Sequence, residues 1–301
     1  MSVDVEPAEG ELLVQPRACG LNRADLNEYR AGGSFPGREL AGEVVALGRG
    51  VTDWAVGDRV MARGAGRSAA PVAVPASLAM RVPESFSWAE AGALPIALMT
   101  MHDALSTRGR LSVAGRVLIH AATSGVGVTG VQLAALLGAS VVFATSRSSA
   151  KLDVLRRHVG DLPCELVGID TSTTPFESVA ADLDVIVDNV GASVLPGNIA
   201  AAAVTGRIVQ VGRLGGRAAE IDLEELARKR IELIGVSFRT RSQAEVAAIV
   251  GRVVTEVGPQ MESVRPRVAR TYPMSEWQTA FEDLARNDHV GKLVLADHED
   301  V

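Results

Sequence analysis

The sequence predicts an α/β protein in which a doubly wound parallel-sheet domain interrupts a β-rich domain. Between residues 91 and 262, strand-like and helix-like segments alternate, and several strands are continuous apolar runs typical of strands buried on both faces. Residues 1–90 and 263–301 instead carry short β-type runs with Gly- and Pro-rich connections. Because both ends share this texture, we expect them to form one domain, and 301 residues is the length of about two domains.

The first part of the chain is expected to hold short strands around one short helix. Strands are predicted at 11–19, 40–48 and 56–62. A helical patch begins near Arg23, between the first two strands. Near residue 87 the pattern changes, because Ser87 is followed three residues later by Glu90, which is the capping-box pattern of a helix start. We expect this helix to run to about Leu105.

The middle of the chain is expected to alternate strands with helices. Strands are predicted at 117–120, 141–144, 166–170, 184–191, 207–212 and 231–238. Helices follow the first strand, the second from about Ser149, and the third, and an amphipathic helix covers 243–257. After Pro266, VARTYP predicts a strand, a helix starts at Ser275, and a final strand covers 291–296.

The segment 117–138 combines a buried strand, a small-residue turn and an apolar helix. Small residues let the backbone approach a pyrophosphate, which the helix N-terminus then binds. Against the dinucleotide pattern G-x-G-x-x-G, the aligned residues are Ala122, Ser124 and Gly127, so only the last glycine is in place. The alternative is a strand-to-helix turn of any α/β protein, but the strand, helix and second strand around it favour a dinucleotide. The candidate phosphate-binding residues are Ser124, Gly125, Val126 and Gly127.

The end of the second strand indicates which dinucleotide is bound. An acidic residue there would bind the ribose hydroxyls of NAD and repel a 2′-phosphate, but ATSRSSAK at 144–151 contains no carboxylate. Thr145 and Ser146 offer hydrogen-bond donors, while Arg147 and Lys151 offer positive charge to a phosphate. These residues predict NADPH; the alternative is that Arg147 and Lys151 are solvated side chains near a helix start.

Composition excludes several other function classes. The net charge is −6 and no Lys/Arg-rich run occurs, so nucleic acid is not an expected partner. Cys19 and Cys164 match no metal-binding spacing. The acidic start of the chain is no signal peptide, and no uncharged apolar run reaches the roughly 18 residues of a membrane helix. We therefore expect a cytoplasmic protein that neither associates with a membrane nor binds a metal ion.

With these motifs in view, the sequence resembles the zinc-free, quinone oxidoreductase-like and enoyl reductase-like branch of the medium-chain dehydrogenases/reductases. The resemblance spans about residues 9–295 through ACGLNRADL, PGRELAGEVVALG, VGDRV, GALPIALMTMHDAL, HAATSGVG, DNVG and VGKLVL. It implies a GroES-like β-rich domain plus a Rossmann domain, with the nicotinamide in the cleft between them. It also implies a homodimer that pairs through the strand at 231–238.

Differences between this sequence and two related dehydrogenase families limit the reactions that we expect. Zinc-dependent relatives carry a Cys where Asn22 stands and a His where Arg38 stands, and a catalytic zinc requires three protein ligands. The Tyr-x-x-x-Lys pair of short-chain dehydrogenases is absent, because neither Tyr29 nor Tyr272 has a lysine four residues later. What remains is hydride transfer from a nicotinamide without a metal.

The resemblance and the strand ends together imply the remaining site residues. Asn22 is expected beside the nicotinamide, where it donates to a substrate carbonyl or holds the ring, although an Asn there also caps a helix. Thr100 is expected on a cleft-lining helix; the alternative is a packed helical Thr. Candidate residues around the nicotinamide half are Asn189, Val190, Gly191, Gly212, Arg213, Ser237 and Phe238. Lys292 corresponds to a lysine common in the family; its alternative is a surface charge before an edge strand.

Two features of the first domain stay open. Some enoyl reductases of the family use a proton-donating Tyr in the loop before the PG-x-E segment, whereas RAGGSFPGRE places only Phe35 there. Tyr29, Arg38 and water remain alternatives, with Tyr29 expected on a core-facing helical position. Relatives also begin with an extra strand or two, so we expect an N-terminally trimmed β domain with an exposed edge or a more open cleft.

The sequence thus predicts an NADPH-dependent, zinc-free reductase of an α,β-unsaturated carbonyl compound (an enone or enoyl thioester) or a quinone. Hydride would pass to the β-carbon while Asn22 polarises the carbonyl. The alternatives are a dinucleotide-binding sensor or scaffold of the same fold with weak or no catalysis, and a specialised reductase in a biosynthetic pathway.

Overall fold

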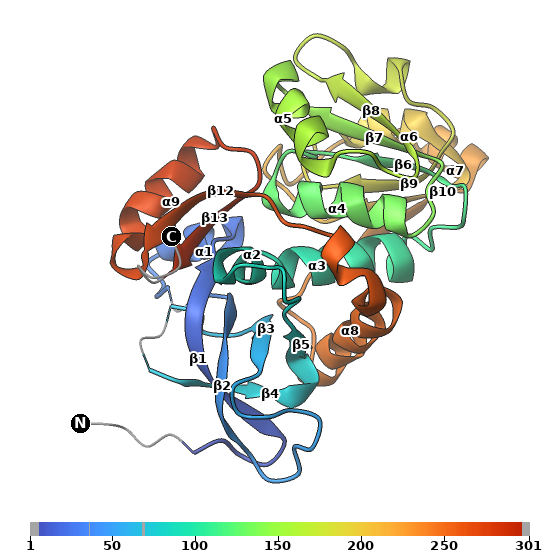
Figure 1. The fold of residues 1–301 in the computed structure, drawn as a ribbon. Coiled ribbons are helices and arrows are strands. Elements are labelled where there is room, and N and C mark those ends of the chain that lie inside the picture. Colours follow the sequence, from blue (N-terminus) through green and yellow to red (C-terminus); the bar gives the residue numbers. More distant parts are fainter. Residues whose placement is uncertain (1–5, 36, 68–69, 297–301) are drawn as a thin grey trace. The chain divides into compact units, whose positions relative to one another are not determined.

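The computed structural model describes residues 6–35, 37–67 and 70–296. The chain divides into two compact units, Met1–Met99 with Ser242–Val301, and Thr100–Arg241. These limits differ from the expected boundaries at 90 and 262, which remain a prediction. The predicted fold class is confirmed, since one unit is β-rich and the other contains a parallel sheet (Figure 1).

Within the described residues, the first unit contains a seven-stranded sheet with the order β12-β13-β1-β2-β3-β5, and β4 pairs with β1. Its strands are β1 (Glu11–Gly20), β2 (Glu39–Leu47), β3 (Arg59–Arg63), β4 (Val72–Pro75), β5 (Ala79–Arg81), β12 (Val268–Pro273) and β13 (Lys292–Ala296). β13 lies inside the sheet, antiparallel to β1 and parallel to β12. The pairing of Gly20 with Val294 therefore brings two distant parts of the chain side by side.

The helices of the first unit correct one prediction. They are α1 (Arg23–Arg30), α2 (Trp88–Ala93), α3 (Pro95–His102, which continues into the second unit), α8 (Gln243–Glu256) and α9 (Trp277–Arg286). Ser87 and Glu90 form the expected capping box, since each side chain accepts the other's backbone N–H. The single helix expected to Leu105 was wrong: α2 ends before Pro95, which lacks an N–H and begins α3 instead. Residues Asp103–Arg108 then continue as a π-helical segment.

Over residues 100–241, all of which the structure describes, a six-stranded parallel sheet has the order β11-β10-β9-β6-β7-β8. Its strands are β6 (Arg116–Ile119), β7 (Val141–Ser146), β8 (Glu165–Asp170), β9 (Leu183–Asp188), β10 (Ala202–Gln210) and β11 (Glu232–Gly235). The chain builds β6, β7 and β8 in one direction, then crosses back to place β9 beside the other edge of β6. This reversal is the switch point of a doubly wound fold, where ligands bind at the carboxyl ends of the strands.

Helices cover both faces of this sheet (Figure 1). They are α4 (Gly125–Leu136), α5 (Ser149–Val159), α6 (Leu195–Ala201) and α7 (Leu223–Lys229). On β6, Ile119 faces α4, whereas the neighbouring Leu118 packs with Ile199 of α6 and Leu226 of α7. Successive strand residues point to opposite faces, so α4 lies on one face and α6 and α7 lie on the other.

Some element limits differ from the expected ones. The strand expected at 231–238 ends at Gly235, and the strand expected at 56–62 begins only at Arg59, after the turn at Gly57. The elements β4, β5, α6 and α7, which have three to seven residues each, were not predicted.

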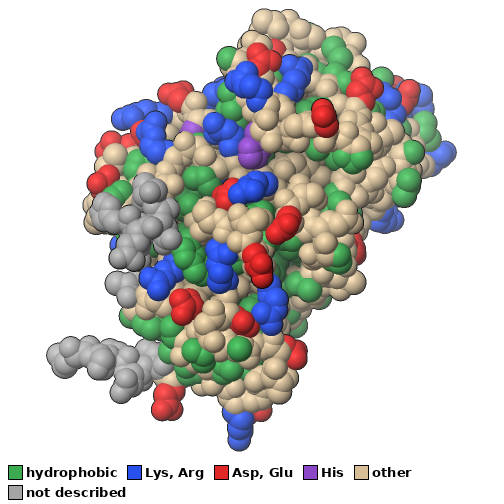
Figure 2. Space-filling model, in the orientation of Figure 1, with side chains coloured by type: hydrophobic (Ala, Val, Ile, Leu, Met, Phe, Trp, Pro, Cys, Tyr) green, Lys and Arg blue, Asp and Glu red, His purple; other side chains and the backbone are tan. Residues whose placement is uncertain are grey.

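The charged side chains of the surface and the lengths of the helices can also be compared with the sequence predictions. On the face drawn in Figure 2, acidic and basic side chains are interspersed. None of the helices in the described part of the chain combines the length and apolar character that crossing a bilayer requires.

Candidate functional site

The turn between β6 and α4 is built to leave helix N–H groups available. Ser124 is the N-cap of α4: its hydroxyl accepts the Gly127 N–H at 3.1 Å and donates to the Ala121 carbonyl at 2.8 Å. Gly125 and Val126 occupy the first two helical positions, whose N–H groups have no acceptor within a helix. Both residues are half-buried, so these two donors and the positive end of the helix suit an anion.

Gly127 is required by the close approach of helix and turn. A Cβ at this position would lie 2.3 Å from the Ala121 oxygen and 2.6 Å from the Ala122 Cα, and both are backbone atoms that cannot move aside. This is the role of the third glycine in the dinucleotide pattern. The turn thus keeps the packing function of that pattern although Ala122 and Ser124 replace its first two glycines.

The four residues predicted at the end of β7 fall into two groups. Thr145 and Ser146 are buried; the Thr145 hydroxyl lies 3.0 Å from His120 Nδ1, and the Ser146 hydroxyl lies 3.3 Å from that of Thr123. Arg147 is exposed, and Lys151 is half-buried in the first turn of α5. Of these four residues, Arg147 is thus the most exposed.

An acidic side chain also lies at the start of α5. The Asp170 carboxylate, at the end of β8, accepts the Ser149 N–H at 2.7 Å, and the N–H and hydroxyl of Ser172 at 2.9 and 2.6 Å. These hydrogen bonds hold the pKa of Asp170 below its ordinary value. The Asp170 carboxylate thus caps the start of α5 and the turn that follows β8.

A chain of buried polar side chains runs beneath the carboxyl ends of β7, β6 and β9. His120 follows β6 and is only 1% exposed; its Nε2 lies 2.7 Å from Asn198 Oδ1. Asn198 Nδ2 donates to Asp188 Oδ2 at 3.2 Å. Burial lowers the pKa of His120 to about 4, so the ring is neutral at pH 7, whereas burial raises the pKa of Asp188.

The loops after β9 and β10 are joined at the same edge of the sheet. Asp188 Oδ1 accepts the N–H groups of Val190 and Gly191 at 2.8 and 2.7 Å, while its carbonyl accepts the Val211 and Gly212 N–H groups. A Cβ on Gly212 would lie 1.9 Å from the Asn189 carbonyl oxygen, so only glycine fits there. The structure thus brings Asn189, Val190 and Gly212 together, whereas Arg213 beside them is exposed.

Asn189 carries an unsatisfied acceptor at this edge. Its Nδ2 donates to the His120 carbonyl at 2.9 Å, but its Oδ1 is buried without a hydrogen-bond partner among the described residues. A buried unpaired amide oxygen is costly unless a ligand supplies a donor. Together with the open N–H groups of α4, this acceptor shows that the residues present fit a dinucleotide.

Ser237 and Phe238 lie in the segment after β11, and Thr100 lies on α3. Ser237 is exposed, and Phe238 is half-buried beneath the Arg241 guanidinium, which lies 4.8 Å from the ring centre. Arg241 also pairs with the buried Asp103 carboxylate at 2.5 Å. Thr100 is buried on α3, in keeping with the alternative of a packed helical Thr.

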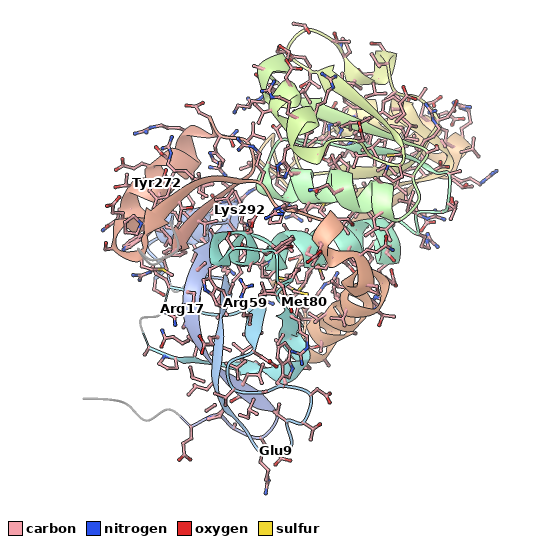
Figure 3. All side chains as sticks on the ribbon, viewed as in Figure 1. Glu9, Arg17, Arg59, Met80, Tyr272 and Lys292 are labelled. Carbon is pink, nitrogen blue, oxygen red and sulfur yellow. The ribbon has the colours of Figure 1, made fainter. Side chains whose placement is uncertain are left out.

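In the first unit, Asn22, Glu39 and Lys292 form a buried charged cluster. Lys292 begins β13 (Figure 3), and its ammonium lies 2.6 Å from Asn22 Oδ1 and 2.7 Å from Glu39 Oε1. Asn22 Nδ2 donates to Glu39 Oε1 at 2.8 Å, and Glu39 Oε2 accepts the Ile96 N–H at the start of α3. The alternative of a surface charge for Lys292 was wrong, because this side chain is 5% exposed and β13 is no edge strand.

Asn22 also begins α1, and acidic residues surround Arg38 near that end. The Asn22 N–H donates to Asp25 Oδ2 at 2.9 Å. Arg38 pairs with Asp25 at 3.1 Å and with Glu28. Burial raises the pKa of Asp25 to about 6, although the Asn22 N–H and the Arg38 charge act in the opposite direction. The Arg38 guanidinium is thus held by the two carboxylates of α1.

The aromatic candidates for proton donation lie in or against the core of the first unit. Phe35 is buried, with its ring centre 4.5 Å from that of Phe281. The Tyr29 ring contacts Trp277 and Phe281 at 5.0 and 5.5 Å, although 40% of the residue is exposed. The core-facing position expected for Tyr29 is therefore only partly correct.

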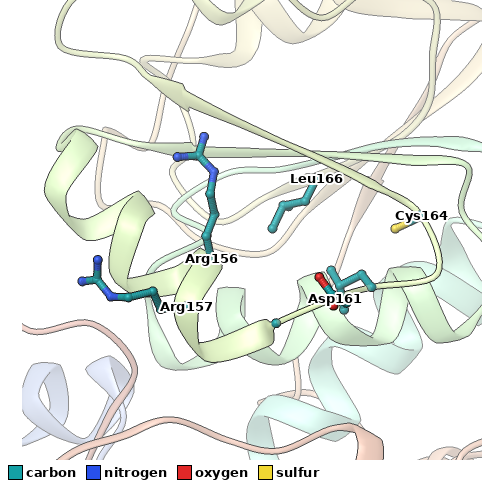
Figure 4. Close-up of a pocket in the computed structure, with 7 residues that line it drawn as sticks. Arg156, Arg157, Asp161, Cys164 and Leu166 are labelled. Atoms are coloured by element: carbon teal, nitrogen blue, oxygen red, sulfur yellow. The ribbon is translucent and has the colours of Figure 1, made fainter.

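A cavity of about 430 Å³ lies beside the amino end of β8 in the second unit (Figure 4). It is lined by residues of the last turn of α5 and the loop before β8, including Arg156, Arg157 and Cys164. These residues lie near the amino end of β8, away from the strand ends that hold the candidate residues. In the described ranges, no group of three or more His, Cys, Asp or Glu side chains is arranged to hold a metal ion.

Sequence reasoning missed four polar residues of these clusters. Glu39 stands within a strand-like motif, and Asp188 ends an apolar strand; a charge inside an apolar run was the available signal. His120 follows the β6 run directly and offered the same signal. Nothing in the sequence marks Asn198, because α6 was not predicted.

Comparisons with known proteins agree on the two-part architecture. Residues 165–295 match the family described as zinc-binding dehydrogenase, and residues 8–84 match the alcohol dehydrogenase GroES-like domain. The chain is 31% identical over 300 residues to the polyketide synthase GfsB of Streptomyces halstedii, which covers 95% of this chain but 5% of that protein. The chain thus spans only a small part of such curated relatives.

Two solved structures resemble the chain over nearly its whole length. An alcohol dehydrogenase superfamily protein from Novosphingobium aromaticivorans is 27% identical, with a TM-score of 0.84, and the match covers 98% of this chain and 94% of that one. The quinone oxidoreductase from Thermus thermophilus, also solved in complex with NADPH, is 26% identical with a TM-score of 0.79, covering 97% and 93%.

Proposed function

Because the chain belongs to the medium-chain dehydrogenase/reductase family, we propose that it is an NADPH-dependent reductase that works without a metal ion. Its substrates are α,β-unsaturated carbonyl compounds, either enones or enoyl thioesters, or quinones. The observations that carry the proposal lie at one edge of the parallel sheet: the first N–H groups of α4, which have no acceptor within the helix, and the buried Asn189 Oδ1, which has no partner among the described residues.

The preference for NADPH rests on charge at the end of β7. Arg147 is exposed there and Lys151 lies one turn into α5, while no carboxylate stands between 144 and 151. The Asp170 carboxylate is occupied by the Ser149 N–H and by Ser172. A 2′-phosphate would gain from the two cations, and arginine binds phosphate bidentately.

When bound, the cofactor supplies the hydride; the protein supplies position and polarisation. The amide of Asn22 is fixed because Lys292 donates to its oxygen and its nitrogen donates to Glu39. The second Nδ2 hydrogen has only a long contact of 3.4 Å to the Gly20 carbonyl. We infer that this hydrogen polarises the carbonyl of the substrate.

The metal-free character rests on the two positions that bind zinc in relatives. Asn22 is held by Glu39 and Lys292, and Arg38 brings a positive charge paired with Asp25 and Glu28. Zinc is bound by Cys, His and carboxylate side chains, and neither the Asn22 amide nor the Arg38 guanidinium is such a ligand, so zinc binding is disfavoured. A chelator should therefore leave turnover unchanged.

We also propose that the protein is a homodimer. β11 pairs with β10 along one side only, and its other side pairs with no described strand. Leu233 on this strand is 46% exposed, and an exposed strand edge is a template for pairing with a second copy. Sedimentation should give a dimer at micromolar concentration, and Leu233→Lys should shift it to monomer; a wild-type monomer would contradict the proposal.

The function is tested by following NADPH oxidation with a panel of enones, enoyl thioesters and quinones. We expect turnover with at least one class, and slower turnover with NADH. The similarity to polyketide synthases supports a role in a biosynthetic pathway, which makes enoyl thioesters the first class to test. NADPH binding without turnover of any class would overturn the proposal in favour of a sensor or scaffold.

A further inference from the structure

We propose that Thr145, His120, Asn198 and Asp188 form a positioning chain that presents Asn189 Oδ1 to a hydrogen-bond donor on the nicotinamide half of the dinucleotide. This inference rests on the proposed function. It assigns a ligand chemistry to Asn189, namely a hydroxyl or amide N–H donor. It also assigns a role to three residues that the sequence did not single out.

Every hydrogen bond in the chain has one consistent direction. The Asp188 carboxylate only accepts, so Asn198 must present Nδ2 to it and Oδ1 to the ring. His120 must then carry its proton on Nε2, which leaves Nδ1 as the acceptor for the Thr145 hydroxyl. The charge of Asp188 thus sets the tautomer of His120, two side chains away.

The chain holds both the loop and the amide that would meet the ligand. Asp188 fixes the Val190 and Gly191 N–H groups with its side chain and those of Val211 and Gly212 with its carbonyl. The His120 carbonyl takes the Asn189 Nδ2 hydrogen at 2.9 Å, so the Asn189 amide cannot rotate freely. Its Oδ1 is left as a buried acceptor on a residue that is 9% exposed.

Strand order assigns this acceptor to one half of the cofactor. A pyrophosphate at the start of α4 sits at the end of β6, and β7 on one side of β6 bears the 2′-phosphate candidates Arg147 and Lys151. β9 lies on the opposite side of β6. Asn189, which follows β9, therefore lies on the side of the nicotinamide half.

The first arm of the test is independent of cofactor binding. Nitrogen NMR of labelled protein should show neutral His120 as the Nε2–H tautomer in the wild type. In Asp188→Asn, each hydrogen bond can reverse: the new amide donates to Asn198, Asn198 donates to Nε2, and the ring proton moves to Nδ1. We expect the Nδ1–H tautomer in that variant; an unchanged tautomer, or a charged ring at pH 7, would overturn the chain.

The second arm measures dissociation constants for NADPH and for 2′,5′-ADP, which carries only the adenosine half. Asn189→Ala and Asn198→Leu should weaken NADPH about tenfold and leave 2′,5′-ADP within about twofold. Asn27→Ala, at an exposed position of α1, is the control.

The outcomes separate this inference from the proposed function. Equal losses for NADPH and 2′,5′-ADP in Asn189→Ala, or no loss for either, would overturn the positioning role. If the wild type binds neither nucleotide, the proposed function fails, whereas the tautomer measurement still decides whether the chain exists. If Asn198→Leu does not fold, Asn189→Ala and Asp188→Asn carry the test.

Discussion

The ammonium of Lys292 lies 2.6 Å from the amide oxygen of Asn22, although 270 residues separate them in the chain. The antiparallel pairing of β13 with β1 makes this contact possible, because Val294 lies opposite Gly20. Glu39 from β2 completes the cluster by accepting from both side chains. The sheet of the first unit therefore fixes the orientation of the residue that we place next to the reacting carbonyl.

Glu39→Gln should strongly destabilise the protein. Glu39 is 0% and Lys292 5% exposed, so the substitution leaves a buried cation without a counter-charge, at a cost of about 3–5 kcal/mol. The matched control is Glu43→Gln on the same strand, whose pair with Arg17 at 3.7 Å is 40% and 37% exposed and should contribute at most about 1 kcal/mol. Urea unfolding compares the two; equal losses would show that the Lys292 charge has another partner.

Asn22→Ala should separate catalysis from cofactor binding. The variant removes the amide that polarises the substrate carbonyl, and loss of one such donor lowers kcat by about 10²-fold. The NADPH dissociation constant should change little, because the proposed phosphate and adenosine contacts are residues of the second unit. Asn27→Ala on the same helix should leave both quantities unchanged. A parallel loss of kcat and NADPH affinity in Asn22→Ala would indicate that Asn22 holds the nicotinamide or supports the fold and does not polarise the carbonyl.

Much of the fold was predictable because many of its elements carry strong local signals. The apolar runs of β6, β9 and β10 predicted a parallel sheet, and Ser87 with Glu90 predicted a helix start that the structure confirms. The break at Pro95 was readable in principle, since proline lacks the N–H that continues a helix. β4 and β5 were missed because they form through pairing with β1 and β3, which no local pattern records.

Arg147→Ala should narrow the preference for NADPH over NADH. Arg147 is exposed at the end of β7, and its loss removes a charge-assisted contact to the 2′-phosphate. We expect the NADPH dissociation constant to rise about tenfold while that for NADH stays constant. Arg157→Ala in the last turn of α5, the helix that follows Arg147, is the control for a change of net charge. An equal rise for both cofactors would argue against 2′-phosphate recognition.

Gly127→Ala should abolish dinucleotide binding. The added Cβ would lie 2.3 Å from the Ala121 carbonyl oxygen, so the turn and the start of α4 must separate. Gly251→Ala is the matched control, since this helical glycine in α8 has no atom within 4 Å of such a Cβ. The control should bind NADPH normally and gain up to about 1 kcal/mol of stability. Normal NADPH binding by Gly127→Ala would contradict the assigned phosphate site.

His120 should make the protein less stable in acid. Its pKa is about 4 in the folded state and 6.5 ordinarily, so between these values the unfolded chain binds a proton that the folded protein does not. Stability from this group is complete above pH 6.5 and falls by about 3 kcal/mol as the pH drops to 4. Asp25, with a folded pKa of about 6, acts oppositely, because the folded protein holds its proton more tightly.

The difference between wild type and His120→Gln isolates the histidine from Asp25. Urea unfolding at neutral pH and near pH 4.5 should show a smaller acid loss in the variant than in the wild type. An identical acid loss in both proteins would mean that His120 is not held neutral by burial.

The candidate site was predictable where a residue type is tied to a backbone position. Gly127 and Ser124 are of this kind, since a close approach and a helix cap each demand a particular side chain. Thr145 was expected to face the ligand, yet its hydroxyl lies against His120, because a strand residue turns inward or outward according to register. Glu39 and Asn198 are functional candidates only through partners far away in sequence, so no local motif could have identified their roles.

Deuteride transfer tests the central claim most directly. Chelator-treated protein would be incubated with NADPH deuterated at the transferable position and an enoyl thioester or enone, and the product analysed by mass spectrometry. Metal-free hydride transfer predicts deuterium at the β-carbon of the reduced product, at a rate that added zinc does not change. A product without deuterium, or turnover that returns only when zinc is added, would contradict it.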